Sequence, residues 1–325
     1  MIQKEIGTNE AGQRLDKFLQ KFMPLANTSF YYKMLRKKNI TLNGKKAEGK
    51  EKLLSGDVVS FFLSEETIKS FQGSGIERTE YDRAYRKLED IQIIYEDEHI
   101  ILMNKPKNIL SQKAKEDDCS LNEWLIGYLL ENGLNQDSLN TFKPSICNRL
   151  DRNTQGLVVG AKSLAGSQEM NRLIRTREIQ KYYRLFVKGT ISKEEVLEGY
   201  LLKDEKNNKV RLVKQASEET SFIKTRYYPI KTYKDKTLVE VELITGKSHQ
   251  IRIHMASIGH PLLGDYKYGD KKWNDQYKEK FQISSQQLYA CRLQFPQMEG
   301  VLCYLSGKCF EAPVPESFQL LMKTD

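Results

Sequence analysis

The 325-residue sequence contains no long hydrophobic run and few residues of the kinds that build covalent or metal-linked frameworks. No segment approaches the roughly 18 apolar residues of a membrane-spanning helix, and the first ten residues lack the apolar core and cleavage site of a signal peptide. Its five cysteines are an odd number and form no CxxC pair, so a disulfide framework is not expected. We therefore expect an untargeted cytoplasmic protein with reduced thiols and no membrane contact.

Common cofactor and nucleophile motifs are also missing. The GKS sequence at 246–248 is not a phosphate-binding loop, because Val241 stands where that loop requires glycine. The GSG sequence at 73–75 is not a dinucleotide fingerprint, since position 78 is not glycine. The four histidines show no metal-ligand spacing with cysteine, and no GxSxG motif occurs. The sequence therefore predicts neither a metal nor a cofactor.

The composition fits a folded protein of more than one domain. Hydrophobic residues make up 39% of the chain, including 17 Tyr and 13 Phe, which supplies enough apolar surface for packed cores. The length exceeds what one core usually organises, so two domains are expected. The net charge of +9 (52 basic against 43 acidic residues) favours a polyanionic partner such as nucleic acid.

The first 66 residues have the pattern of a small α/β domain. Residues 14–23 place apolar side chains at helical spacing, Ser29 is expected to cap a second helix, and a strand near 40–45 enters an Asn43-Gly44 turn. A further strand is expected at 55–63. Between positions 33 and 52, eight basic and two acidic residues give a net +6. A solvated helix face would also explain such a run. The eight are Lys33, Arg36, Lys37, Lys38, Lys45, Lys46, Lys50 and Lys52.

A charged, glycine-containing stretch at about 64–90 is interpreted as a linker, so we divide the chain into a domain at 1–66, a linker at 67–88 and a domain at 89–325. A hairpin should follow at 91–106, then a helix capped by Ser120 and ended by Gly133. This part is strand-rich with interspersed helices, which indicates an α+β fold. The expected strands lie at 156–162, 181–189, 221–230, 237–244, 288–295 and 301–307.

Two polar segments of the second domain contain candidate site residues. Asp151 precedes a strand opened by Gly156, so its carboxylate should lie on a loop facing a cleft, although such an aspartate is more often a turn residue. Ser248 should cap a helix with a buried stripe at positions 251, 255 and 258, which places Arg252 on a neighbouring face. An arginine in that position is usually a surface residue.

Three motifs, taken in order, carry a resemblance to a known family. NRLDRNTQG at 148–156 resembles the signature HRLDxxTSG, and KYYRLFVKG at 181–189 resembles KxYxAxVxG. GKSHQIRIHMASIGHPLLGDYKYG at 246–269 resembles GRTHQIRVHLxxxGHPIxGDxxYG, and the hairpin EDEHIILMNKP is also similar to the family's. The chain thus resembles the RluA, RluC and RluD family of pseudouridine synthases, with an RluC-like layout. Its N-terminal part resembles the RNA-binding domain named after ribosomal protein S-four.

The resemblance implies a pseudouridine synthase fold, which is a mixed, largely antiparallel sheet with flanking helices and a central cleft, preceded by the small RNA-binding domain. It implies isomerisation of uridine to pseudouridine in RNA without a cofactor, in large-subunit ribosomal RNA or in transfer RNA. We expect the protein to be a monomer. Asp151 would be the catalytic carboxylate. Arg252 would pair with it, and Tyr183 would stack on the uracil and help remove the proton from carbon 5.

The resemblance also implies RNA-binding residues. Arg149 would fill the space that the flipped base leaves, and the basic cluster would face RNA. The helix start at 249–254 would be organised by side chains that also contact the RNA backbone. The predicted RNA-binding set is Arg149, Lys33, Arg36, Lys37, Lys38, Lys45, His249, Gln250 and His254.

The sequence departs from the family's motifs at three positions, and it leaves the chemical route and two alternative functions open. Asn148 and Gln155 replace the family's His and Ser, and Leu185 replaces its Ala, which bears on loop packing and RNA choice rather than on the carboxylate. The carboxylate could attack the anomeric carbon, add to carbon 6 of the base, or abstract a ribose proton to give a glycal. A non-catalytic RNA-binding or ribosome-assembly factor and an RNA N-glycosylase that releases uracil are the alternative functions.

Overall fold

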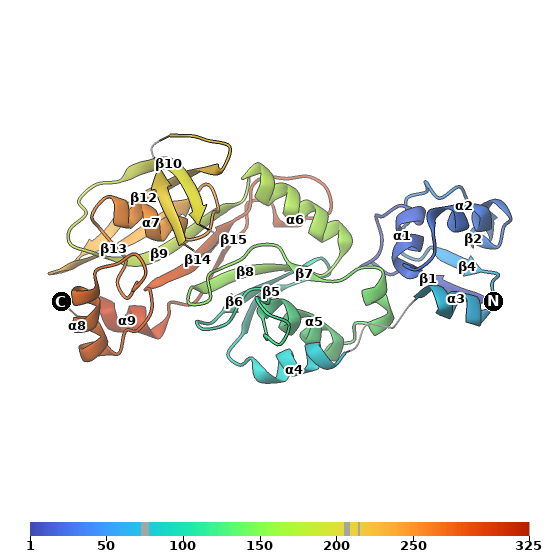
Figure 1. Ribbon diagram of the computed structural model, residues 1–325, viewed down its shortest axis with the longest axis horizontal. Coiled ribbons are helices and arrows are strands. Elements are labelled where there is room, and N and C mark those ends of the chain that lie inside the picture. Colours follow the sequence, from blue (N-terminus) through green and yellow to red (C-terminus); the bar gives the residue numbers. More distant parts are fainter. Residues whose placement is uncertain (73–77, 205–208, 214, 325) are drawn as a thin grey trace.

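A computed structural model of the chain describes residues 1–72, 78–204, 209–213 and 215–324. The chain forms two sheets, a four-stranded one near the N-terminus and an eleven-stranded one in the remainder, which lie at opposite ends of an elongated molecule (Figure 1). The N-terminal elements are β1 (Ile2–Glu5), α1 (Leu15–Phe22), α2 (Thr28–Arg36), β2 (Ile40–Leu42), β3 (Lys45–Lys46), β4 (Val58–Phe61) and α3 (Glu65–Gln72).

The N-terminal unit largely follows the sequence pattern. The predicted stripe of α1 is buried in the core of this unit, and Asn43 and Gly44 both adopt positive φ in the tight turn between β2 and β3. The cap of α2 differs from the prediction, because Asn27 rather than Ser29 accepts the free backbone N–H of Phe30, at 2.9 Å. Asn27 lies at the extended N-cap position, whereas Ser29 is already inside the helix.

Most of the described part of the stretch interpreted as a linker is helical, whereas its GSG sequence at 73–75 lies outside the described residues. Helix α3 buries Ile68 against the N-terminal core, and α4 (Thr79–Lys87) buries Tyr81 and Ala84. The contact between α4 and α5 (Leu121–Glu131) is close, since a β-carbon on Gly127 would lie 2.4 Å from the carbonyl oxygen of Tyr81. The few apolar residues of α4, at positions 81, 84 and 85, are spaced three and four apart, so one face suffices to pack the helix. The sequence prediction gave too much weight to the charges between them.

The second sheet has the order β11-β10-β12-β13-β9-β14-β8-β6-β5, with β7 paired to β8 and β15 paired to β14. All described pairings are antiparallel except that of β14 with β8. The predicted mixed, largely antiparallel sheet is therefore confirmed. The strands are β5 (Gln92–Glu96), β6 (Ile100–Lys105), β7 (Ser145–Ile146), β8 (Gln155–Ala161), β9 (Gln180–Lys188), β10 (Glu195–Asp204), β11 (Lys209–Val213), β12 (Thr220–Thr232), β13 (Lys236–Leu243), β14 (Leu288–Gln294) and β15 (Cys309–Glu311).

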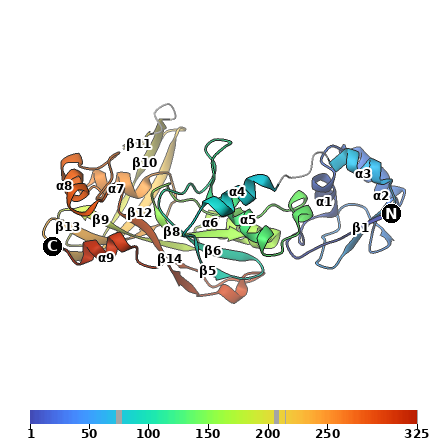
Figure 2. The same cartoon turned by 90° about the horizontal axis from the view of Figure 1, so that it is seen from below.

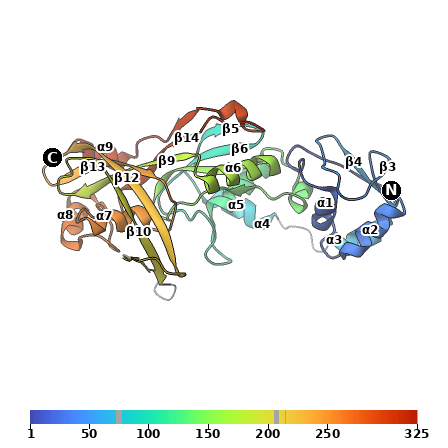
Figure 3. The same ribbon diagram turned by 90° about the horizontal axis from the view of Figure 1, so that it is seen from above.

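Helices flank this sheet. Figures 2 and 3 show that β10, β11 and β12 project from the rest of the sheet on the side of α7. The prediction of a helix capped by Ser120 is confirmed for α5, and Gly133 follows it with φ +95°. The remaining helices are α6 (Leu164–Thr176), α7 (Gln250–Ser257), α8 (Lys271–Phe281) and α9 (Glu316–Met322), with short 3-10 helices η1 (Gln136–Asn140) and η2 (Cys303–Leu305).

Two segments of this part differ from the sequence prediction. The expected strand at 301–307 is replaced by η2, which buries Leu302 and Leu305 beneath the sheet, and the nearby strand is β15 instead. The β10–β11 hairpin was not predicted, because its charged residues obscure the alternation of apolar positions. Within the described residues, no helix is long and apolar enough to cross a membrane.

The parallel junction of β8 and β14 lies directly under the predicted Asp151 loop. Gly156 has φ +108°, and a β-carbon there would lie 2.2 Å from the carbonyl oxygen of Ala290. Only glycine permits both this backbone conformation and this approach. The glycine that opens β8 thus fixes where the preceding loop leaves the sheet.

Candidate active site

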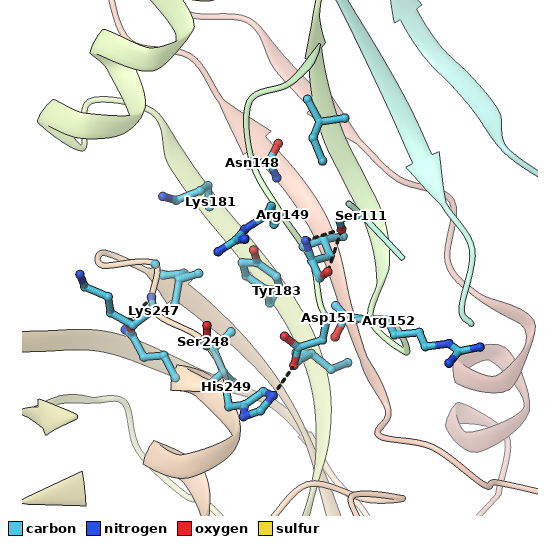
Figure 4. A pocket seen from close by; sticks show the side chains of 18 of the residues that line it. Ser111, Asn148, Arg149, Asp151, Arg152, Lys181, Tyr183, Lys247, Ser248 and His249 are labelled. Atoms are coloured by element: carbon cyan, nitrogen blue, oxygen red, sulfur yellow. Dashed lines mark hydrogen bonds and ion pairs between the residues drawn. The ribbon is translucent and has the colours of Figure 1, made fainter. Parts of the chain in front are cut away.

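A cleft of about 870 Å³ opens beside β9 and α7. It is lined by residues of four chain segments that are distant in sequence, at 110–114, 146–154, 174–183 and 243–252, and by Leu288. Figure 4 shows side chains of these segments facing one another across the cleft. The fold thus brings the three polar motifs of the sequence to one place.

The Asp151 loop is held on both sides of the aspartate. The Ser111 hydroxyl donates to the carbonyl of Leu150 at 2.7 Å and accepts from the Leu150 N–H at 2.9 Å. The Thr154 N–H donates to the Asp151 carbonyl at 3.0 Å, which closes a turn. The backbone on either side of Asp151 is therefore fixed, and the carboxylate, 28% exposed, points into the cleft (Figure 4).

Lys105 supports the same loop from below. Its side chain is fully buried, and its ammonium donates to the carbonyls of Pro106 at 2.9 Å, Ile109 at 2.9 Å and Arg152 at 3.1 Å. Three carbonyls satisfy the three donors of the ammonium. Burial nevertheless lowers the pKa of Lys105 to about 7, although the charge of Asp151 opposes this shift.

Arg252 links two carboxylates. One nitrogen, Nη1, lies 3.1 Å from Asp151 Oδ2, while Nε and Nη2 bind the two oxygens of Asp265 at 2.7 and 2.8 Å. The Asp265 oxygen Oδ1 also accepts from the backbone N–H groups of Lys267 and Tyr268. Asp265 therefore anchors the guanidinium bidentately, and the remaining nitrogen, Nη1, donates to Asp151. This arrangement confirms the predicted contact of Arg252 with Asp151.

His249 also faces the carboxylate. Its Nε2 lies 3.9 Å from Asp151 Oδ2, and its Nδ1 lies 2.9 Å from the hydroxyl of Tyr268. Burial lowers the pKa of His249 below its ordinary value of 6.5, so the ring is mostly neutral at pH 7. His249 has φ +57° and precedes the helix, so the predicted cap by Ser248 is wrong.

Tyr183 lies on β9 on the cleft side of the sheet (Figure 4). Its ring is 6% exposed, and burial together with the charge of Asp151 raises the pKa of its hydroxyl, so the phenol is neutral at pH 7. Its neighbour Tyr182 points to the opposite face, where Arg292 stacks on it at 3.7 Å. Leu185, two residues beyond Tyr183 along the same face of β9, is fully buried.

The residues predicted to contact RNA at α7 are buried. Gln250 is 2% exposed, and its side chain bonds Thr245 at 2.8 Å and Thr225 at 2.9 Å. His254 is 1% exposed and bonds Thr225 at 2.8 Å, and burial lowers its pKa to about 4. His254 is not among the residues lining the cleft. A direct RNA contact by His254 is therefore inconsistent with its burial, and both side chains fix α7 to β12.

The other predicted RNA-binding residues are exposed in two separate places. Arg149 lines the cleft, with Nη1 3.4 Å from the Gln112 side chain. The basic residues of the N-terminal unit lie on α2, at its end and on β3, and not at the cleft. These are Lys33, Arg36, Lys37, Lys38 and Lys45.

Sequence reasoning missed several residues that shape the cleft. Lys105 and Ser111 hold the Asp151 loop, and the only sequence signal for Lys105 is a lysine that ends an apolar strand. The unusual Asn148 bridges to β8, accepting from the Val159 N–H at 2.8 Å and donating to the Leu157 carbonyl at 3.3 Å. An asparagine thus holds the start of the motif in place. In the described part of the chain, no three His, Cys, Asp or Glu side chains are grouped to hold a metal ion.

Comparisons with known proteins agree with this arrangement. Residues 99–257 match the family model described as RNA pseudouridylate synthase. The chain is 30% identical over 297 residues to "Ribosomal large subunit pseudouridine synthase C" of Vibrio cholerae, covering 90% of this chain and 87% of that protein. It is 31% identical over 322 residues to an "Uncharacterized RNA pseudouridine synthase" of Mycoplasma genitalium, covering 96% and 95%. Among solved structures, "Human RNA Pseudouridylate Synthase Domain Containing 4" shares the fold, with a TM-score of 0.57, 20% identity, and coverage of 74% of this chain and 94% of that one.

Proposed function

Because the chain belongs to the RNA pseudouridine synthase family and isomerises uridine in RNA to pseudouridine, we propose that Asp151 is its nucleophile and large-subunit ribosomal RNA its substrate. One observation carries the assignment of the nucleophile. Asp151 and Arg252 are 101 residues apart in sequence, yet their side chains meet at 3.1 Å in the cleft beside Tyr183. The substrate rests on the name of the Vibrio cholerae relative.

The geometry suits a carboxylate that must be aimed at the substrate. Arg252 provides a charge-assisted hydrogen bond that orients the Asp151 carboxylate, and Asp265 keeps the guanidinium in place. In the reaction the bond between uracil nitrogen 1 and the ribose breaks, and a bond from carbon 5 to the same ribose carbon forms. Nitrogen 1 gains a proton and carbon 5 loses one. Attack on the sugar, attack on the base and the glycal route all need a carboxylate in this position.

Tyr183 and Arg149 have roles in base flipping under this proposal. A base in a stem or stacked loop must leave its stack, at a cost of a few kcal/mol. The ring of Tyr183 offers a face on which uracil can stack inside the cleft, and its hydroxyl can relay the carbon 5 proton by accepting that proton while passing its own to solvent. Arg149, which is exposed at the rim of the cleft, fills the space that the base leaves in the RNA.

The N-terminal unit is proposed to supply affinity for RNA. Its basic residues are solvent-exposed, and those on α2 are free of ion pairs with any described carboxylate. Contacts of such residues with phosphates give salt-sensitive binding that carries little sequence information. We propose that a monomer is active, because Asp151, Tyr183 and Arg252 of one chain already meet in the cleft, and that it acts in the cytoplasm where ribosomal RNA is processed.

The test uses ribosomal and transfer RNA that carry uridine tritiated at carbon 5. The wild-type chain should release tritium from large-subunit ribosomal RNA, because the carbon 5 proton leaves during isomerisation. The Asp151→Asn variant should release none while keeping its RNA affinity. Release by that variant at the wild-type rate would exclude Asp151 as nucleophile. Release only from transfer RNA would overturn the proposed substrate, and free uracil would indicate hydrolysis instead of isomerisation.

A further inference from the structure

Three basic residues at the rim of the cleft have no carboxylate partner in the described part of the chain. Lys181 lies on β9, Arg177 follows α6, and Lys247 precedes α7. Lys181 is 9% exposed, and none of the described side-chain hydrogen bonds or ion pairs involves its ammonium. Figure 4 shows the Lys181 side chain directed into the cleft.

The opposite face of the same strands is organised differently. There Arg184 pairs with Glu240 at 3.1 Å, Arg292 pairs with Glu240 at 2.8 Å, and Arg226 pairs with Glu242 at 3.5 Å. The sheet thus neutralises arginines on its outer face, whereas Lys181 on its cleft face meets no carboxylate among the described residues. Cations that are left unmatched beside a cavity mark a place for an anion.

The position of Lys181 is costly without such an anion. Burial lowers the pKa of Lys181, and the positive charge of Arg177 lowers it further. An ammonium that is both desolvated and repelled by a neighbour destabilises the folded protein. A bound anion would reverse both effects, since it supplies hydrogen-bond acceptors and a negative charge.

The spacing along β9 relates Lys181 to the reacting nucleotide. Lys181 and Tyr183 are two residues apart, so their side chains leave the same face of the strand about 7 Å from each other. If uracil stacks on Tyr183, the sugar-phosphate backbone of that nucleotide passes within reach of a lysine side chain at this distance. Phosphate is the anionic group of RNA.

Gly246 leaves the space above the ammonium open. A β-carbon at this position would lie 3.9 Å from Lys181 Nζ, and no other atom would come as near. The backbone of Gly246 is not in the left-handed region, so its conformation does not require glycine. A longer side chain would cover the amine, whereas glycine keeps it accessible from the cleft.

We propose that Lys181, Arg177 and Lys247 form a subsite for the RNA backbone phosphate next to the flipped uridine. This inference rests on the proposed function. It adds a second contact that positions the substrate, in addition to the pair that Arg252 of α7 forms with Asp151. By holding one phosphate, the subsite fixes the sugar relative to the carboxylate. Small changes in such positioning have large effects on turnover.

The test removes the negative charge of one phosphate in the RNA, the positive charge of Lys181 in the protein, and then both, and compares the three effects on kcat/KM. The substrate is a short RNA spanning the uridine that the wild-type chain modifies, with neutral methylphosphonate placed at one backbone position at a time near that uridine. At one position the wild-type kcat/KM should fall about tenfold, the value of a hydrogen bond between charged groups. In Lys181→Met the same replacement should change kcat/KM by less than about twofold, because the partner is already gone.

Lys193→Met is the matched control, since Lys193 is exposed and does not line the cleft. It should keep the wild-type response to methylphosphonate. If Lys181→Met loses the same factor as the wild type, or if no single phosphate matters to the wild type, the subsite is refuted. Tritium release by the wild type from the unmodified RNA tests the proposed function independently of this result.

A second variant guards against loss of folding as the cause. Gly246→Glu places a carboxylate over Lys181 and should act as a competing anion, with the same loss of response to methylphosphonate. Thermal unfolding separates the subsite from a structural role, because removal of an unpaired buried charge should leave Tm of Lys181→Met equal or higher. A lower Tm, together with an unchanged methylphosphonate response, would show that Lys181 serves the fold and not the RNA.

Discussion

Asp265 and Asp151, whose carboxylates both contact Arg252, should contribute very differently to the stability of the folded protein. Asp265 is 1% exposed and binds the guanidinium through two short hydrogen bonds, so Asp265→Asn leaves a buried positive charge partly unpaired. Breaking a buried pair in this way typically costs about 3–5 kcal/mol. Asp151 is 28% exposed and makes one contact with Arg252, so Asp151→Asn should cost less than about 1 kcal/mol. Both variants should lose turnover, but only Asp265→Asn should lose stability.

Urea unfolding followed by tryptophan fluorescence measures this difference. Both tryptophans, Trp124 and Trp273, lie in the second part of the chain, so the signal reports on the part that contains the cleft. The free energy of unfolding is extrapolated linearly to water for each variant. Asp275→Asn is the control, since this carboxylate accepts one exposed hydrogen bond from Tyr266. Equal losses for Asp151→Asn and Asp265→Asn would refute the assignment of Asp265 as the anchor.

The pair of Asp265 and Arg252 predicts that the free energy of unfolding depends on pH. Burial alone would raise the pKa of Asp265, but the hydrogen bonds and charge of Arg252 outweigh it and lower that pKa below the ordinary value of 3.8. A lowered folded-state pKa stabilises the protein at pH values above the unfolded pKa, and this stabilisation is lost as the pH falls through the folded value. The difference between the wild type and Asp265→Asn should therefore be full at neutral pH and shrink below about pH 4.

Three further changes test other parts of the structure. Gly156→Ala should lower the unfolding temperature of the second part of the chain strongly, because the new β-carbon would lie 2.2 Å from a backbone oxygen of β14. Gly300→Ala is the control in the same thermal scan: Gly300 also has a positive φ, +82°, but no atom lies within 4 Å of its β-carbon position, so the unfolding temperature should fall far less. Lys105 has a pKa of about 7 in the folded protein against 10.5 in the unfolded chain, so its contribution makes the free energy of unfolding rise with pH between these values. Urea unfolding of Lys105→Met should lack that rise. The same dependence of the free energy on pH in wild type and variant would contradict the burial of the charge. Lys37→Glu combined with Lys38→Glu should weaken RNA binding and reduce the slope of log K against log salt by about 2, with turnover at saturating RNA largely kept. A loss confined to turnover would contradict a binding role for these two lysines.

Local patterns predicted the elements whose signals are carried by neighbouring residues. The stripe of α1, the Asn43-Gly44 turn, the capped helix α5 and the hairpin of β5 and β6 all have such signals, and all are confirmed. The wrong strand at 301–307 shows the limit, since a short apolar run also packs as the 3-10 helix η2 under the sheet. The choice between these depends on where the segment meets the rest of the core.

The sequence by itself determined the family, the order of its motifs and the presence of Asp151 on a loop before β8, because these depend on residue identity and short spacing. The tertiary structure decided which groups meet. It placed Arg252 between Asp151 and Asp265, buried His254 outside the lining of the cleft, and left the Lys181 ammonium without a partner among the described side chains. These contacts join strands and helices up to a hundred residues apart, and local periodicity contains no information about such partners. The physical reason is that charge pairing and burial depend on strand order and sheet face, which only the folded chain fixes.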